Sequence, residues 1–134
     1  MDGRVAIEVI KQRFERVDRQ IRIPLQKGRS FKAFMTDEGI MVDNLGSQSL
    51  LPWIVFEEAI DLLIRNGGRV EKGNAMNSKL GEEGLPLDSI EGHIAHAVYG
   101  KKLGDSVFRR ISPISAILVW AKLCDTNPGE LVLC

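Results

Sequence analysis

The two histidines, His93 and His96, are the residues best suited to chemistry, because imidazole serves both as a metal ligand and as a proton acceptor near neutral pH. Their spacing allows both rings on one face of a helix, with Glu91 close in sequence. A zinc site needs a third and usually a fourth ligand, yet the chain has no other histidine and no HExxH pattern. The sequence therefore predicts exposed polar side chains here and no metal site.

Nucleophilic catalysis has as little support. A serine or cysteine nucleophile needs a neighbouring base and an orienting group, and no GxSxG motif occurs. The stretch "NGGRVEKGNAM" matches neither GxxxxGK[ST] nor GxGxxG, and Gly67-Gly68 is explained as a helix terminator. Asp37, Glu38 and Asp43 flank a turn and are interpreted as solvated. We predict no catalytic residue and no cofactor, and expect a protein that is not an enzyme.

Composition places the chain among ordinary globular proteins. Its 134 residues suit one domain, and its 44% hydrophobic and 27% charged content exclude a disordered class. No apolar run reaches membrane-span length, and the first residues mix acids with bases, unlike a secretory signal. Cys124 and Cys134 belong to no CxxC pair, so free thiols are expected. These features predict a cytoplasmic protein.

Charge is unevenly distributed along a chain whose formal net charge is zero. Residues 1–35 hold nine basic and four acidic side chains, whereas residues 36–66 hold one basic and six acidic. Zero net charge argues against binding polyanions by bulk charge alone. We favour docking of a basic N-terminal helix on an acidic one over a basic patch for an external partner.

Periodicity defines the elements of the N-terminal third. Apolar residues recur at helical spacing over 5–17. "QIRIPLQ" alternates as a short strand, and Pro24 confines that strand to a sheet edge. Residues 31–36 and 39–43 form two strand-like runs joined by a turn in which Gly39 relieves the backbone. This third is predicted to form a helix, an edge strand and a hairpin.

The next two thirds are predicted to be mainly helical. A helix begins at Pro52 and ends at Asn66-Gly67-Gly68, with one apolar face made by Trp53, Phe56, Ile60, Leu63 and Ile64. A short helix is expected over 74–80. A further helix over 88–99 is expected to use Asp88 and Glu91 as a capping box and to face Ile90, Ile94 and Val98 inward, before Gly100 ends it.

The C-terminal part is predicted as a hairpin, a helix and a tail. Gly104-Asp105 forms a turn between strands at 99–103 and 106–111. Ser112-Pro113 then begins a helix with almost no polar face, which must be enclosed by the domain or by a second subunit. The tail, residues 125–134, is interrupted at Pro128-Gly129.

This order of elements resembles a winged helix-turn-helix DNA-binding domain over about Leu51 to Ile111, chiefly in "NAMNSKLGEEGLPLDSIEGHIAHAV". Ala75 and either Ile90 or Ile94 would hold the two short helices together, although "GEEGLPLD" is longer than the usual turn. The expected fold is α+β, a mostly helical single domain over 1–134 with a small antiparallel sheet. Within it, residues 1–50 form the N-terminal helix and hairpin, 51–124 the winged-helix-like region and 125–134 the tail.

The resemblance implies a recognition helix over 88–99 whose outward residues meet DNA: Ser89, Gly92, His93, His96 and Tyr99. Phosphate contacts would come from the bases in or beside the wing: Lys101, Lys102, Arg109 and Arg110. The two arginines are adjacent on a strand, so only one is expected to contact DNA. These expectations describe a non-enzymatic transcriptional regulator that binds double-stranded DNA as a homodimer.

Other interpretations remain open. The same polar residues also fit an ordinary solvated surface, since Glu91 and nearby acids would repel a phosphate backbone. A protein-interaction module could use the apolar last helix and tail, with Ile117 and Trp120 in the contact. A small-ligand-binding protein could enclose a pocket between "FMTDEGIMVDNLG" and the helix that starts near Trp53.

Overall fold

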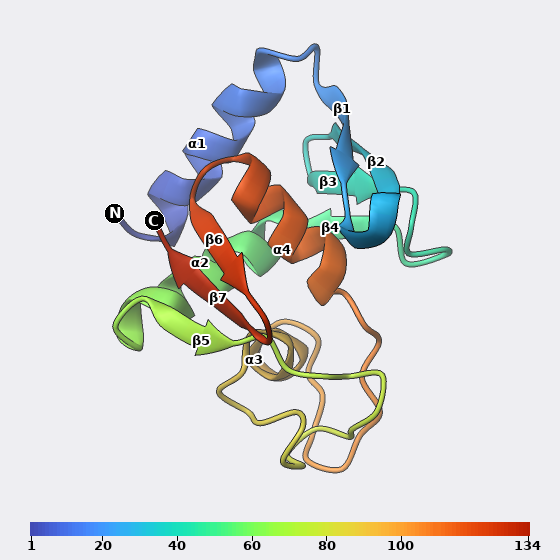
Figure 1. Ribbon diagram of the computed structural model, residues 1–134, viewed down its shortest axis with the longest axis vertical. Helices are drawn as coiled ribbons and strands as arrows, with labels where there is room; N and C mark the ends of the chain where they lie inside the picture. Colours follow the sequence, from blue (N-terminus) through green and yellow to red (C-terminus); the bar gives the residue numbers. More distant parts are fainter.

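A computed structural model describes residues 1–134 as four α-helices, one short 3-10 helix and two antiparallel sheets (Figure 1). The α+β class expected from the sequence is confirmed. No helix is long and apolar enough to cross a membrane. In chain order the elements are α1 (Gly3–Glu15), β1 (Gln20–Pro24), η1 (Gln26–Gly28), β2 (Ser30–Met35), β3 (Gly39–Val42), β4 (Leu50–Pro52), α2 (Trp53–Arg65), β5 (Arg69–Glu71), α3 (Ile90–Ala97), α4 (Ile111–Trp120), β6 (Cys124–Asn127) and β7 (Glu130–Leu133).

The first sheet joins β1 to β4 in chain order, with every neighbouring pair antiparallel. Alternate residues of β2 are buried, as expected for a strand with one face on the core. The predicted edge strand and hairpin are confirmed, and Pro24 lies on the edge strand β1. Gly39 is required for close approach, because a Cβ there would lie 2.1 Å from the backbone oxygen of Leu51.

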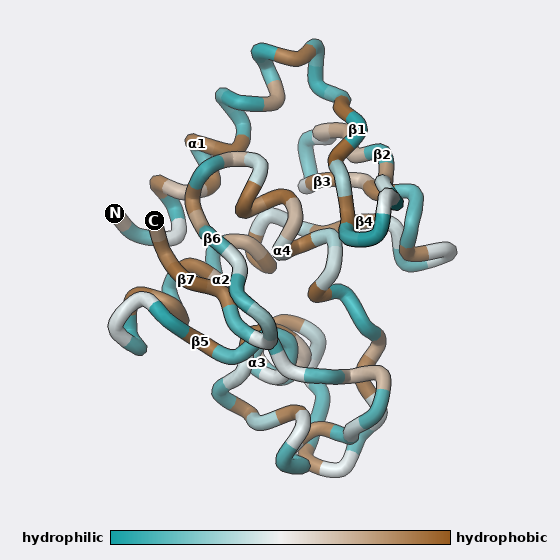
Figure 2. Tube along the Cα trace, in the orientation of Figure 1, coloured by the Kyte–Doolittle hydropathy of each residue, from teal (hydrophilic) through white to brown (hydrophobic).

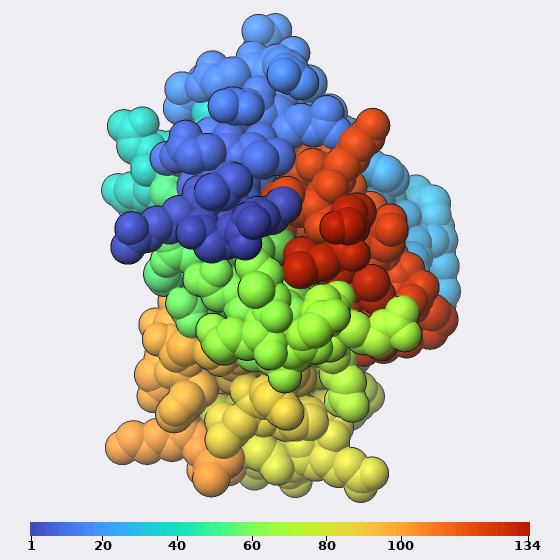
Figure 3. Space-filling model, turned by 90° about the vertical axis from the view of Figure 1, so that its left-hand side faces the viewer, coloured from blue at the N-terminus to red at the C-terminus, as the bar shows by residue number.

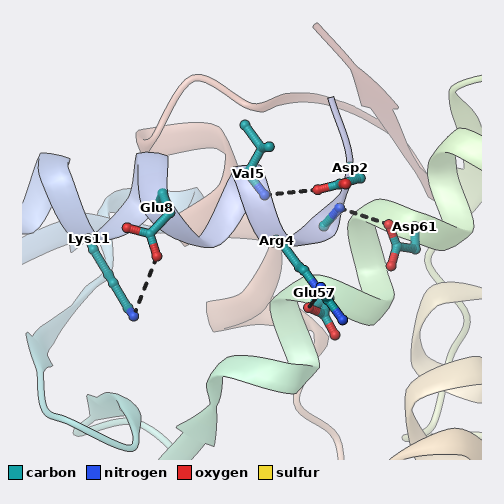
Figure 4. Close-up of polar contacts among 8 residues, drawn as sticks. Asp2, Arg4, Val5, Glu8, Lys11, Glu57 and Asp61 are labelled. Atoms are coloured by element: carbon teal, nitrogen blue, oxygen red, sulfur yellow. Dashed lines mark hydrogen bonds and ion pairs between the residues drawn. The ribbon is translucent and has the colours of Figure 1, made fainter.

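The predicted docking of the basic first helix on the acidic second one is confirmed (Figure 4). The backbone N–H of Gly3 donates to Asp61 Oδ1 at 2.7 Å, and Arg4 lies 3.9 Å from a Glu57 carboxylate oxygen. A Cβ on Gly3 would come within 2.5 Å of the Glu57 backbone oxygen, so the two helices are in close contact. Arg4 is largely exposed, so that ion pair contributes little stability.

One large core unites both sheets with all four α-helices. The inward face of α2 is largely as predicted, with Phe56, Ile60 and Leu63 fully buried. Ile64 was wrongly placed on that face, because it is 40% exposed at the last turn of the helix. Trp53 is half-buried and donates its indole N–H to the backbone oxygen of Asp37, in the turn between β2 and β3.

The apolar helix α4 is enclosed by its own chain. Ile114, Ile117 and Leu118 are fully buried, so this part of the helix is covered within the domain, whereas Trp120 is half-buried. The helix starts at Ile111 with Arg110 in the cap position, so the predicted Ser112 cap was wrong. Figure 2 shows the concentration of hydrophobic residues along α4 and β7.

The second sheet, in the order β5-β7-β6, was not predicted. The break at Pro128-Gly129 is the turn of the β6–β7 hairpin, so the tail is an integral part of the fold. The pairing of Val70 with Leu131 joins residues far apart in sequence. Short strands whose partners are so distant leave no local pattern to detect. Both cysteines are free, as expected.

Residues 72–110, here called the loop region, form one end of the molecule, coloured yellow and orange in Figure 3. Two predictions were wrong here: residues 74–80 form turns rather than a helix, and residues 99–111 contain no strand and therefore no wing. Helix α3 is the region's one regular element. Asn74 and Asn77 lower the helix propensity of this segment, and Gly73 and Gly81, which flank it, have positive φ angles that interrupt a helix.

Candidate functional site

The structure places the expected outward face of α3 largely inside the protein. Ser89 is 1% exposed and is the cap of the helix, since its Oγ accepts the Gly92 N–H at 3.1 Å. Its hydroxyl also donates to the Pro86 backbone oxygen at 2.6 Å. The predicted cap, Asp88, is exposed. Ser89 therefore has a structural role and is not available to a base edge.

Gly92 permits close approach, but to the chain itself rather than to a DNA groove. It is buried, and a Cβ there would lie 2.0 Å from the backbone oxygen of Pro86. The segment that leads into α3 thus packs directly against the helix backbone. The expectation that Gly92 faces outward was wrong.

The remaining aromatic residues of the expected face have separate partners. His93 is half-buried and donates through Nε2 to a Glu58 carboxylate oxygen at 2.8 Å, which joins α3 to α2. His96 is exposed, and its Nδ1 donates to the Lys101 backbone oxygen at 2.9 Å. Tyr99 is half-buried. The two imidazoles therefore do not converge, and no group of three or more His, Cys, Asp or Glu side chains could hold a metal ion.

The four bases expected on the wing are dispersed. Lys102 and Arg109 are exposed and Lys101 is half-buried, whereas Arg110 is only 6% exposed. The guanidinium of Arg110 lies 3.7 Å from the Tyr99 ring centroid and donates to a side chain of the first sheet's loop, Gln48 Oε1, at 2.8 Å. Only one of the adjacent arginines faces outward, as predicted, although the backbone there is not a strand. Arg110 is a structural residue that links the loop region to the first sheet.

A cleft beside α4 collects basic residues more effectively than α3 does. Figure 1 shows α4 between the end of β1 on one side and β6 on the other. The cleft along this helix has a volume of about 510 Å³. Apolar walls come from both sides, and hydroxyl groups line the space between: Ile23, Pro24, Leu25, Val119 and Trp120 are apolar, and Ser112, Ser115 and Thr126 carry hydroxyls.

Three cations from three separate segments line this cleft: Arg29, Lys72 and Arg109. Arg29 precedes β2, Lys72 follows β5, and Arg109 lies just before α4. No carboxylate lines the cleft; the nearest in sequence, Glu71 and Asp125, are exposed outside its lining. The cleft therefore has a net positive potential in a chain with no net charge.

Lys72 is the most constrained of the three cations that line the cleft. Its side chain is half-buried, and its ammonium donates to Thr126 Oγ1. Burial lowers the pKa of Lys72 from its ordinary value, because desolvation disfavours the charged form. An anion placed beside the ammonium would offset that desolvation.

Glu91 fixes the backbone on both sides of the loop region. Its backbone N–H donates to the Lys72 oxygen at 2.9 Å, and its carboxylate accepts the N–H groups of Arg110 at 2.7 Å and Ile111 at 3.1 Å. The carboxylate also satisfies the first N–H groups of α4. Burial raises the pKa of Glu91 to about 7, against the opposing effects of these hydrogen bonds and of the Arg110 and Arg109 charges. One buried residue thus positions the segments that carry Lys72 and Arg109.

A second group of cations lies at the far end of α4. Arg13, Arg16 and Lys122 line a shallow hollow of about 230 Å³. The guanidinium of Arg13 also donates to the backbone oxygen of Trp120 at 3.5 Å. Arg13 thus lines the hollow and contacts a residue that lines the cleft.

Sequence reasoning missed Arg29 and Lys72 as site residues and considered Trp120 only as part of a protein contact. The excess of basic residues in 1–35 pointed to such a surface, because Arg4 is the one base of that stretch that forms an ion pair with α2. We interpreted the basic residues of 1–35 as a means of docking α1 on α2, and this interpretation gave no role to the bases of that stretch that lie away from α2. Lys72 could not be placed without the fold, since β5 pairs with the distant β7.

Searches against family models, curated proteins and solved structures find no significant match to this chain. Cations, hydroxyl groups and an indole ring around an open cleft can bind an anionic, partly apolar ligand.

Proposed function

We propose that this protein is a non-enzymatic DNA-binding protein whose contact surface is the cleft beside α4. The convergence of Arg29, Lys72 and Arg109 without a lining carboxylate carries the proposal. Phosphate contacts by lysine and arginine release counterions and supply most of the affinity for a nucleic-acid backbone. The nearby hollow with Arg13, Arg16 and Lys122 extends the same potential along α4.

The proposed ligand is still DNA, as predicted from the sequence, but the proposed contact surface is different. The recognition helix and wing are replaced by the cleft, because Ser89, Gly92 and Arg110 are buried. The bases of the loop region that do not line the cleft, Lys101 and Lys102 among them, are then side chains without a role in binding. Roles in transcription and as a homodimer stay predictions from the sequence.

The test is a salt titration of binding to a fluorescent DNA duplex. Replacing the three cleft cations together by glutamine (Arg29→Gln, Lys72→Gln, Arg109→Gln) should weaken binding strongly. It should also lower the slope of log affinity against log salt by about 2 to 3, at roughly 0.9 per lost phosphate contact. Circular dichroism checks that the variant keeps its fold.

The matched control removes three other cations of the loop region, none of which lines the cleft, through Lys79→Gln, Lys101→Gln and Lys102→Gln. It makes the same change in net charge away from the cleft lining. Its affinity should remain close to that of the wild type. If the control loses as much affinity as the cleft variant, or more, the interface includes Lys79, Lys101 and Lys102 rather than the cleft. If the affinity does not depend on salt concentration, the proposal is wrong.

A further inference from the structure

The cleft is built for more than phosphate. A site for backbone phosphates alone needs only cations and hydrogen-bond donors, whereas this cleft has apolar walls from two different parts of the fold. One wall is the end of the edge strand β1, with Ile23 and Pro24, and the other is α4, with Val119 and Trp120. Such walls favour a ligand that carries an apolar, flat part as well as a charge.

Trp120 is the residue that a flat group would meet. It is half-buried and lines the cleft. Phe14 packs against it in an edge-to-face arrangement with ring centroids 4.8 Å apart. The ring is therefore held in place before any ligand arrives, which lowers the entropic cost of stacking.

The size of the cleft favours an unpaired nucleotide over a nucleic-acid duplex. A volume of about 510 Å³ is in the range of small-molecule sites. In a duplex the bases are stacked inside the helix, so a duplex can touch only the rim with its phosphates. An unpaired nucleotide can place its base in the cleft while its phosphate remains at the cations.

We propose that the cleft holds one unpaired nucleotide of a DNA strand, with the base against Trp120 and the phosphate among Arg29, Lys72 and Arg109. The hydroxyls of Ser112 and Ser115 are available to the edge of the base. This inference rests on the proposed DNA-binding function and names the form of DNA that the same site takes. Single-stranded, frayed or locally unpaired DNA is then preferred to an intact duplex.

The experiment compares three DNA probes on the full chain: a short oligothymidylate, an abasic strand with the same number of phosphates, and a duplex. Intrinsic fluorescence reports the contact, because the chain has only two tryptophans. In Trp53→Phe the remaining signal comes from Trp120, and oligothymidylate should quench it while the abasic strand should not. Trp120→Phe is the matched control, in which the signal of Trp53 should not change.

Affinity gives a second measure. Trp120→Leu keeps apolar bulk but removes the aromatic face, and it should weaken oligothymidylate binding about tenfold. Its affinity for the abasic strand and its salt slope should be unchanged. The fluorescence result does not depend on this variant, so a folding defect in Trp120→Leu would leave the test intact.

The outcomes separate this inference from the function on which it rests. Equal affinity of wild-type protein for oligothymidylate and the abasic strand, with salt dependence that the cleft cations control, would overturn the unpaired-nucleotide site and keep DNA binding. Displacement of the oligomer by an equal concentration of thymidine monophosphate would show that the occupant is a free nucleotide, which also overturns the inference. Failure of all three probes to bind would remove both proposals.

Discussion

The loop region and the rest of the chain, residues 1–71 and 111–134, are stabilised in different ways. The rest of the chain is built from periodic elements around a core of 27 buried residues, two of which, Ile90 and Ile94, come from α3. The loop region has a separate cluster of only four buried residues: Leu80, Leu85, Ala95 and Val107. Helix α3 therefore packs on two sides at once, and this explains why Ser89 and Gly92 are buried while His96 remains exposed.

Hydrogen bonds between irregular segments hold the loop region together. The N–H of Leu80 donates to the Asp105 oxygen at 3.0 Å, and the N–H of Gly104 donates to the Leu80 oxygen at 2.8 Å. The Asp105 carboxylate also accepts the Lys102 N–H at 2.8 Å. These bonds satisfy backbone groups without a helix or a strand ladder. Irregular structure can thus be well defined while leaving no periodic trace in the sequence.

The largest expected effect comes from the main core. Ile60→Ala removes a fully buried side chain and should lower the free energy of unfolding of the whole domain by about 2–5 kcal/mol. Leu85→Ala removes a fully buried side chain from the four-residue cluster. Its effect should be concentrated in faster amide hydrogen exchange of residues 72–110. Chemical denaturation and residue-resolved hydrogen exchange measure the two quantities.

This pair of variants tests whether the two regions differ in cooperativity. Uniform acceleration of exchange across the chain in Leu85→Ala would show that the regions unfold as one unit. The distinction between them would then describe packing only.

A pH-dependent effect is expected at Glu91, which joins the two regions. Its pKa in the folded protein is about 7, above the ordinary value of 4.5, so the folded state keeps a proton that the unfolded state loses. The resulting stabilisation is fully present below pH 4.5 and is lost as the pH rises through 7. At about 1.4 kcal/mol per pKa unit, the loss is on the order of 3 kcal/mol.

Glu91→Gln should remove this dependence. Relative to the wild type, the variant should gain stability between pH 5 and pH 8, measured by urea denaturation at each pH. Glu83→Gln, at an exposed site, is the matched control and should show no such gain. The opposite trend would mean that the N–H groups of Arg110 and Ile111 stabilise the carboxylate by more than burial costs it.

The smallest effect is expected at Tyr99. Its hydroxyl is buried without a hydrogen-bond partner, while its ring stacks on the Arg110 guanidinium. Tyr99→Phe removes the unpaired hydroxyl and keeps the stack, so the free energy of unfolding should stay equal or rise by up to about 1 kcal/mol. Urea denaturation at pH 7 measures this change. Destabilisation by Tyr99→Phe would indicate that the hydroxyl has a hydrogen-bond partner. As a comparison, Tyr99→Leu should lower the free energy of unfolding, because it removes the stack on Arg110.

The sequence predicted those elements whose burial repeats at a regular period. Helix α2 and the β2–β3 hairpin followed from apolar spacing and from Gly39, Gly67 and Gly68. Helix α3 was also predicted, but its surroundings were not. Periodicity showed that Ile90 and Ile94 face a core, and it could not show that residues 72–89 and 99–110 cover the opposite side.

The candidate site was less predictable than the fold, for a related reason. Its cations come from segments that lie far apart in sequence and meet only after the two sheets have formed. Arg109 and Arg110 are adjacent in sequence and were both considered for phosphate contacts. In the structure Arg110 is buried, and Arg109 lines the cleft. Local charge density is therefore a weaker guide than the position of each charge relative to the burial pattern.

The bonds that Glu91 makes also bear on how the chain is assembled. Glu91 is hydrogen-bonded to both Lys72 and Arg110, the residues at the two ends of the loop region. The chain therefore leaves the rest of the domain and returns to it at neighbouring points. A segment with its ends so close together can change in length or content without moving the elements before and after it. Residues 72–110 thus leave and rejoin the domain at one place, and changes in their exposed turns can reshape one end of the protein while the sheets stay as they are.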